Sequence, residues 1–248
     1  NIILPLNENK NDRSLNFSSI KKEIILFLNQ LHQIEFIDQN SLLTRNISKT
    51  IISSKNDNTN SVNNIIITEK NNDKIIEKQY LVVKKNIEIN RGFWSESDKK
   101  NKRYEIYNTQ ICIAFPLNYD GSLDVGQKYE VFSYLPISRT NGSFRFILHA
   151  DFILKPDRQD IAPDEKWNIL IRSNISKTII EAIEVFKNDD KLKTTFLNFL
   201  PLKKICYRGS IKQKQIFFYP CFFLYQHWFL HHHHKPHYHD KQNLQYHL

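Results

Sequence analysis

The amino-acid sequence predicts an α+β fold in which an antiparallel or mixed β-sheet is flanked by helices. Three observations predict it. Short β-rich runs separated by Asn-rich polar turns fill residues 47–89. Further strand candidates lie between residues 109 and 154, and an amphipathic helical pattern follows at residues 167–188.

The first half of the chain opens with two apolar segments of different period. Asn1–Leu6 reads "NIILPL", a short apolar run interrupted by Pro5, and it predicts a strand. Residues 20–36 follow a Ser-rich cap and carry a broad apolar face at helical spacing, so we expect a helix there. The later runs predict antiparallel strands at residues 47–53, 63–69 and 78–89.

The second half predicts three more strands and then helices. The strand candidates are Thr109–Leu117, Gln127–Ile137 and Ser143–Leu154, and Asn141-Gly142 is a turn signal before the third. Pro163-Asp164-Glu165 has the Pro and the acids that favour a helix start. A shorter second helix is expected at residues 191–200, ended by Pro201.

Composition excludes several classes of site. The chain has 248 residues, a formal net charge of +9 and 5 Gly, with no Gly-rich phosphate-binding motif. The basic balance permits nucleic acid or an acidic partner, but the Lys and Arg residues are spread thinly, which favours a solvated surface. Three Cys without a CxxC pair indicate an intracellular, reducing compartment, with Cys112 as a small core residue.

The two ends of the chain are unusual. The sequence begins at Asn1 without Met, and we expect it to be a fragment of a longer protein. Residues 206–248 are rich in aromatic residues and His, and we expect a disordered or non-native tail. Its apolar part, Ile216–Leu230, is shorter than a spanning helix and is interrupted by Pro220, so no membrane contact is predicted. Nothing fixes the geometry of the His residues, so no metal site is predicted either.

Arg158 is the candidate functional residue, in the stretch "HADFILKPDRQDIAPDEKWN". An arginine on a loop between a rigid strand and a helix is well placed to bind a phosphate carried by another domain. The alternative is an ion pair between Arg158 and Asp151, Asp157 or Asp160, with Trp167 anchoring the helix. The residues by themselves favour this alternative. The sequence contains no paired nucleophile and base and no HExxH motif.

Several ordered stretches resemble a known family. "YLPI" followed by "FRFILHADFILKPDRQDIAPDEKWN" is similar to the "YLPT…F.I.ADF…..SR..I..D..WN" pattern of large sacsin-like and NO VEIN-like proteins. In these proteins an ATPase domain of the histidine kinase, gyrase and heat-shock chaperone (GHKL) superfamily precedes this segment. "NIILPL", "EIILFLNQLHQIEF" and "ICIAFPL" resemble family stretches in the same order. The resemblance covers residues 1–200, but residues 47–89 match only in their general sequence character and not in specific motifs.

The resemblance implies an architecture. Residues 1–38 would be the end of the GHKL ATPase domain, and residues 39–205 an α+β domain placed like the middle domain of heat-shock chaperones. Residues 206–248 would form the tail. Arg158 matches the family's "SR" turn, where a loop arginine of the second domain reaches the γ-phosphate; here Lys155-Pro156-Asp157 replaces the usual small residues before it.

The resemblance also implies a function. The family's ATP and Mg²⁺ sites lie in the upstream domain, so we expect no cofactor and no independent catalysis in these residues. The fragment would couple the ATPase domain to conformational change in a chaperone-like or scaffold protein, with that domain and client proteins as partners. The alternative function is a non-enzymatic basic module that binds nucleic acid or an acidic protein.

Overall fold

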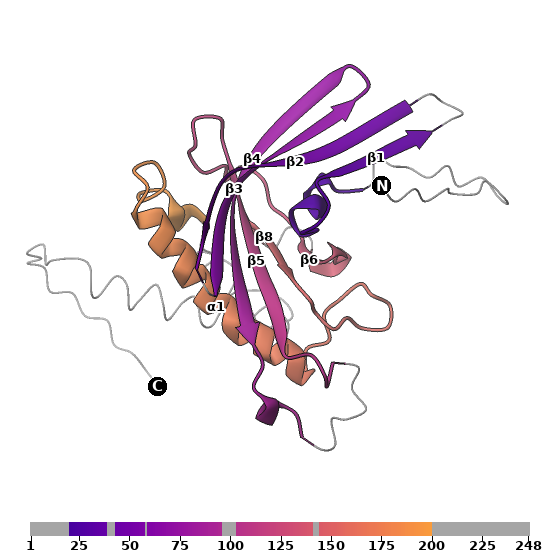
Figure 1. The fold of residues 1–248 in the computed structure, drawn as a ribbon, viewed down its shortest axis with the longest axis vertical. Helices are drawn as coiled ribbons and strands as arrows, with labels where there is room; N and C mark the ends of the chain where they lie inside the picture. Colours follow the sequence, from indigo (N-terminus) through magenta and orange to yellow (C-terminus); the bar gives the residue numbers. More distant parts are fainter. Residues whose placement is uncertain (1–19, 39–42, 58, 96–102, 141–143, 200–248) are drawn as a thin grey trace, which may run out of the picture.

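Buried and partly exposed side chains alternate along residues 60–71, whereas residues 80–83 of the next strand are all buried, as expected where both faces of a sheet are covered. The computed structural model describes residues 20–38, 43–57, 59–95, 103–140 and 144–199. These residues form a curled eight-stranded sheet crossed by one long helix (Figure 1). The fold is therefore α+β with a mixed sheet, as the sequence predicts.

The sheet follows the chain order through its first five strands. Its spatial order is β1-β2-β3-β4-β5-β8-β6-β7, and each neighbouring pair is antiparallel except β6 with β8. The strands are β1 (Gln33–Asp38), β2 (Leu43–Asn56), β3 (Asn60–Asn71), β4 (Lys74–Glu88), β5 (Asn108–Leu117), β6 (Val131–Ser133), β7 (Leu135–Pro136) and β8 (Ile147–Ala150). The remaining elements are helix α1 (Lys166–Lys187) and the short 3₁₀ helices η2 (Lys22–Leu26), η3 (Arg91–Phe93), η5 (Ser138–Thr140) and η6 (Phe196–Phe199).

Two hydrophobic clusters lie on opposite faces of the sheet. The helix-side cluster is formed where α1 packs on β4 and β5, and it includes Trp167, Ile171 and Phe115. The η2-side cluster holds Ile25 and Leu26 against the other face. Strand β5 is buried on both faces from Ile111 to Leu117, because its alternate side chains belong to the two clusters.

The helix predicted for residues 20–36 is wrong. Only Lys22–Leu26 is helical, as a 3₁₀ turn, and Gln33–Asp38 is strand β1 paired with β2. The buried ammonium of Lys49 donates to the carbonyl oxygens of Ile25 and Leu28 and fixes the chain after the turn. An isolated helix of this length is only marginally stable in water, so pairing of residues 33–38 with β2 and packing of η2 on the sheet decide the local structure.

The other predicted elements are confirmed with changes. Strands β2 to β5 and helix α1 lie where the sequence places them. The predicted strand Gln127–Ile137 is broken at Tyr134, whose φ of 62° separates β6 from β7. The predicted strand Ser143–Leu154 keeps only β8, and the expected second helix is reduced to turns and η6. Asn1–Leu6 and the His-rich tail lie outside the described residues.

The division of the chain at residue 38 stays a prediction. Within the described part, η2 and β1 belong to the same sheet assembly as the strands that follow them. The Arg45 guanidinium on β2 donates hydrogen bonds to the carbonyl oxygen of Ile20 and to the carboxylate of Glu69 on β3, both at 2.8 Å. These bonds attach the residues before β1 to the sheet.

Candidate functional site

Arg158 lies at the tip of a short hairpin between β8 and α1. The hairpin closes at the bridge between Leu154 and Ile161, and the Lys155 N–H donates to the Asp160 carbonyl oxygen at 2.8 Å. The Arg158 N–H turns back to the Lys155 carbonyl oxygen at 2.8 Å. Arg158 itself has a φ of 56°, a left-handed conformation that a residue with a Cβ seldom adopts. Its side chain is exposed.

Each acid that could neutralise Arg158 is bound to another cation. Asp151 makes a two-pronged ion pair with Arg103, at 2.6 and 2.9 Å. The remaining two pairs are Asp157 with Arg139 at 3.1 Å and Asp160 with Lys155 at 2.9 Å. Within the described part of the chain, no hydrogen bond or ion pair holds the Arg158 guanidinium. The ion pairs expected for Arg158 are therefore not formed, and its guanidinium faces solvent.

The base of the hairpin is held by two buried side chains of α1. The Asn168 amide donates to the carbonyl oxygens of Ile153 and Ala162, both at 2.7 Å, and its oxygen accepts the Ile153 N–H at 2.9 Å. The Trp167 indole N–H donates to the Asp151 carbonyl oxygen at 2.7 Å. Both side chains are fully buried. We call these two residues the hairpin clamp. As predicted, Trp167 anchors the helix.

Asp151 is not arranged as a general base. Burial raises the pKa of its carboxyl group, and the guanidinium of Arg103 acts in the opposite direction. Both carboxylate oxygens accept from Arg103, whose guanidinium lies 5.0 Å from the centre of the Trp167 ring. This ion pair joins residue 103 to the hairpin clamp, because the Asp151 carbonyl oxygen accepts the Trp167 indole N–H.

His149 is a buried residue that the sequence does not single out. It stacks on Phe27 with ring centres 4.4 Å apart, and Tyr134 approaches it edge-on at 5.1 Å. Its Nε2 is buried without a hydrogen-bond partner. Burial, with a smaller effect of the Lys84 charge, lowers the pKa of His149 from 6.5 to about 4. The imidazole ring is therefore a neutral packing group. In the sequence, its burial is indicated only by its position within the apolar run that forms β8.

Cys112 is buried in β5 next to His149 in the sheet register. Burial raises the pKa of its thiol to about 12, which leaves no thiolate at neutral pH. The prediction that Cys112 is a core residue is confirmed. Cys206 and Cys221 lie outside the described residues.

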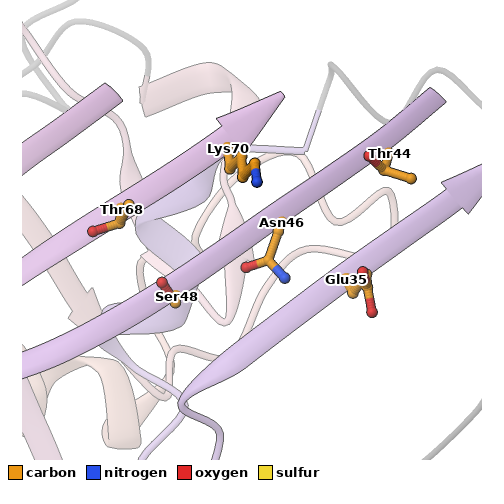
Figure 2. A pocket seen from close by; sticks show the side chains of 6 residues that line it. All are labelled: Glu35, Thr44, Asn46, Ser48, Thr68 and Lys70. Carbon is orange, nitrogen blue, oxygen red and sulfur yellow. The ribbon is translucent and has the colours of Figure 1, made fainter. Parts of the chain in front are cut away.

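A polar trough lies on the open face of the sheet, beyond the reach of α1. It has a volume of about 360 Å³ and is open to solvent. Figure 2 shows its lining side chains rising from three adjacent strands: Glu35 on β1, Thr44, Asn46 and Ser48 on β2, and Thr68 and Lys70 on β3. Glu35, Asn46 and Lys70 are neighbours in one row of the register. The trough has no enclosed apolar wall of the kind that holds a small-molecule cofactor.

The described residues contain no group of three or more His, Cys, Asp or Glu that could hold a metal ion. In the same part of the chain, no helix is both long and apolar enough to cross a membrane. Neither the trough nor the hairpin offers a complete set of ligands for Mg²⁺ and a nucleotide. The His-rich residues and Ile216–Leu230 lie outside the described ranges.

Comparison with known proteins gives one informative match. The chain is 30% identical over 135 residues to Protein NO VEIN of Arabidopsis thaliana. The match covers 49% of this chain and 5% of that protein, so the chain spans about one twentieth of the relative's length. No family model matches, and no solved structure matches. The sequence is therefore similar to NO VEIN over about half of its length.

Proposed function

We propose that this chain is a coupling segment of a NO VEIN-like protein, and that it follows an ATPase domain of the GHKL superfamily in a chaperone-like or scaffold protein. In this proposal Arg158 contacts a phosphate of ATP held with Mg²⁺ by that upstream domain. Residues 39–205 then act as a lever, comparable in position to the middle domain of heat-shock chaperones. The whole protein works inside the cell.

The observation that carries the proposal is that Arg158 lies exposed at the tip of a hairpin whose base is held in place. An arginine serves as a phosphate contact when its guanidinium is free and its backbone is fixed. Here the nearby acids are bound by Arg103, Arg139 and Lys155, and the hairpin clamp holds the loop. The left-handed φ at Arg158 is also a strained feature of the kind that clusters at functional sites.

The similarity to NO VEIN supports the same proposal. The described residues supply only a phosphate contact, and the bound nucleotide would supply the reactive phosphoryl group. The contribution of this chain is therefore to position one guanidinium, and closure of the sheet domain onto the ATPase domain would bring it into place.

The test uses the protein extended upstream of Asn1 along its transcript. We expect ATP hydrolysis in the extended protein, and a loss of roughly 100-fold or more in Arg158→Ala. Arg158→Gly should lose turnover equally while keeping or gaining stability, because glycine accepts a φ of 56°. Turnover and the free energy of unfolding are measured on the same samples.

The control is Arg145→Ala. Arg145 is exposed, and within the described ranges its guanidinium donates to the Asn198 carbonyl oxygen alone, at 3.0 Å, so its removal should leave turnover unchanged. Wild-type turnover in Arg158→Ala would refute the phosphate contact. If the extended protein fails to bind Mg·ATP, the coupling function is wrong. The basic interaction module would then be tested by binding to nucleic acid at rising salt.

A further inference from the structure

Among the residues that the structure describes, strand β1 is an edge of the sheet and has backbone groups without a strand partner. The Lys49 N–H donates to the His32 carbonyl oxygen at 2.9 Å, so position 32 faces β2. In an antiparallel pair the backbone groups of successive residues point alternately toward and away from the partner strand. The N–H and C=O groups of residues 34 and 36 therefore point toward β2, and those of Gln33, Glu35 and Ile37 point away from it. These outward groups form a row that a further strand can bond.

The two edges of the sheet differ in their protection. Strand β7 is two residues long and contains Pro136, both of which hinder pairing. Strand β1 is six residues long and contains neither Pro nor Lys, and its pairing with β2 has no bulge. Ile37 is 58% exposed on it. On the other face, Ile34 is a partly buried apolar side chain that packs against the η2-side cluster.

The charge of β1 selects its partner. The segment "QIEFID" carries two acids and no base, in a chain whose net charge is +9. Glu35 is exposed on the edge, and the described residues place no cation in contact with it. A second copy is a poor partner, because antiparallel pairing across a two-fold axis through all three outward residues sets Glu35 opposite Glu35. Like charges directly opposite each other destabilise a strand pair.

We propose that β1 is a docking edge for an extended peptide segment that adds as a ninth strand. The segment carries Lys or Arg opposite Glu35 on the trough face and an apolar side chain beside Ile34 on the other face. Its backbone bonds the outward groups of Gln33, Glu35 and Ile37, in the strand-addition mode of peptide recognition. This surface is separate from Arg158 and does not depend on the proposed function.

The test measures binding of two labelled eight-residue peptides to the full chain by fluorescence anisotropy. Isoleucine alternates with threonine in both, and one central residue is lysine in the first and glutamate in the second. We expect the lysine peptide to bind roughly fivefold more tightly, and Glu35→Lys to reverse this preference. Ile37→Pro should weaken both peptides, since it removes an outward N–H without removing a bond to β2.

The matched control is Glu77→Lys. It makes the same charge change at an exposed residue of β4, where Glu77 accepts a hydrogen bond from Thr68 at 3.2 Å, and the peptide preference should stay as in the wild type. Amide exchange gives a second measurement, because bound peptide should slow exchange at Gln33, Glu35 and Ile37. The proposal is overturned if neither peptide binds, if Glu35→Lys leaves the preference unchanged, or if these amides are protected by self-association instead.

Discussion

His149 is neutral in the folded chain because it is buried between two aromatic rings with Nε2 unpaired. Protonating it would place a charge in an apolar site that already feels the Lys84 ammonium. The unfolded chain has no such restriction and binds the proton near pH 6.5. His149 therefore ties stability to pH although it takes no part in a reaction.

The pH dependence follows from the direction of this shift. Since the folded pKa of His149 is about 4 and lies below the unfolded value, stability is full above pH 6.5 and falls as the pH drops toward 4. The loss attributable to this residue is about 3 kcal/mol across that window. Urea unfolding of wild type and His149→Phe at pH 7 and pH 4.5 measures it. Equal acid sensitivity in the two proteins would contradict this account of His149.

At the scale of elements, the hairpin clamp connects the start of α1 to the strand before it. Asn168 reinforces the backbone bond from the Ala162 N–H to the Ile153 carbonyl oxygen, since its amide group makes three further bonds to the backbone of residues 153 and 162. The sequence pattern "ADF…WN" thus has a structural meaning in its last two residues. These residues hold the loop, and the loop presents Arg158.

Asn168→Ala should destabilise the protein by about 3 kcal/mol, because the Ile153 N–H and the Ala162 carbonyl oxygen lose their partners and the Ile153 carbonyl oxygen keeps only the Ala162 N–H. Thermal or urea unfolding measures the loss. Asn174→Ala is a suitable comparison, since Asn174 also lies in α1 and is buried, but its amide donates to the Leu170 carbonyl oxygen within its own helix. It should cost clearly less. Equal losses would show that Asn168 acts by burial alone and not as a clamp.

At the scale of the whole molecule, two hydrophobic clusters share one sheet. Strand β4 gives Leu81 and Val83 to the helix-side cluster and Tyr80 and Val82 to the η2-side cluster. The clusters are separated by the backbone of the sheet, yet neither can lose its packing without disturbing the same strands. We therefore expect the described residues to unfold cooperatively.

Leu26→Ala and Ile171→Ala test this coupling from opposite faces, because both side chains are completely buried. Each should cost about 3 kcal/mol. Trp94 and Trp167 both lie on the helix side, and Trp228 can be replaced by Phe in all variants. Leu26→Ala should shift tryptophan fluorescence and circular dichroism transitions together. A fluorescence transition that stays at its wild-type position would show that the two faces unfold separately.

Much of the sheet could be predicted from the sequence, because strand periodicity is a local property. Runs of β-branched residues between Asn-rich turns predict β2 to β5. An apolar stripe and the Pro-Asp-Glu start predict α1. Cys112 could be assigned to the core on the same grounds. In the candidate site, Arg158 and Trp167 stand out by residue type and by their place between a strand and a helix.

Tertiary structure decided the features that depend on distant residues. Residues 20–36 have a helical apolar pattern, but pairing with β2 and the Lys49 ammonium make β1 and a short 3₁₀ turn. The sequence favours an ion pair for Arg158, yet Arg103, Arg139 and Lys155 bind the available acids. Local propensity and spacing are encoded residue by residue. The choice among competing partners depends on which segments the fold brings within hydrogen-bonding distance, and that is settled only when the whole sheet assembles.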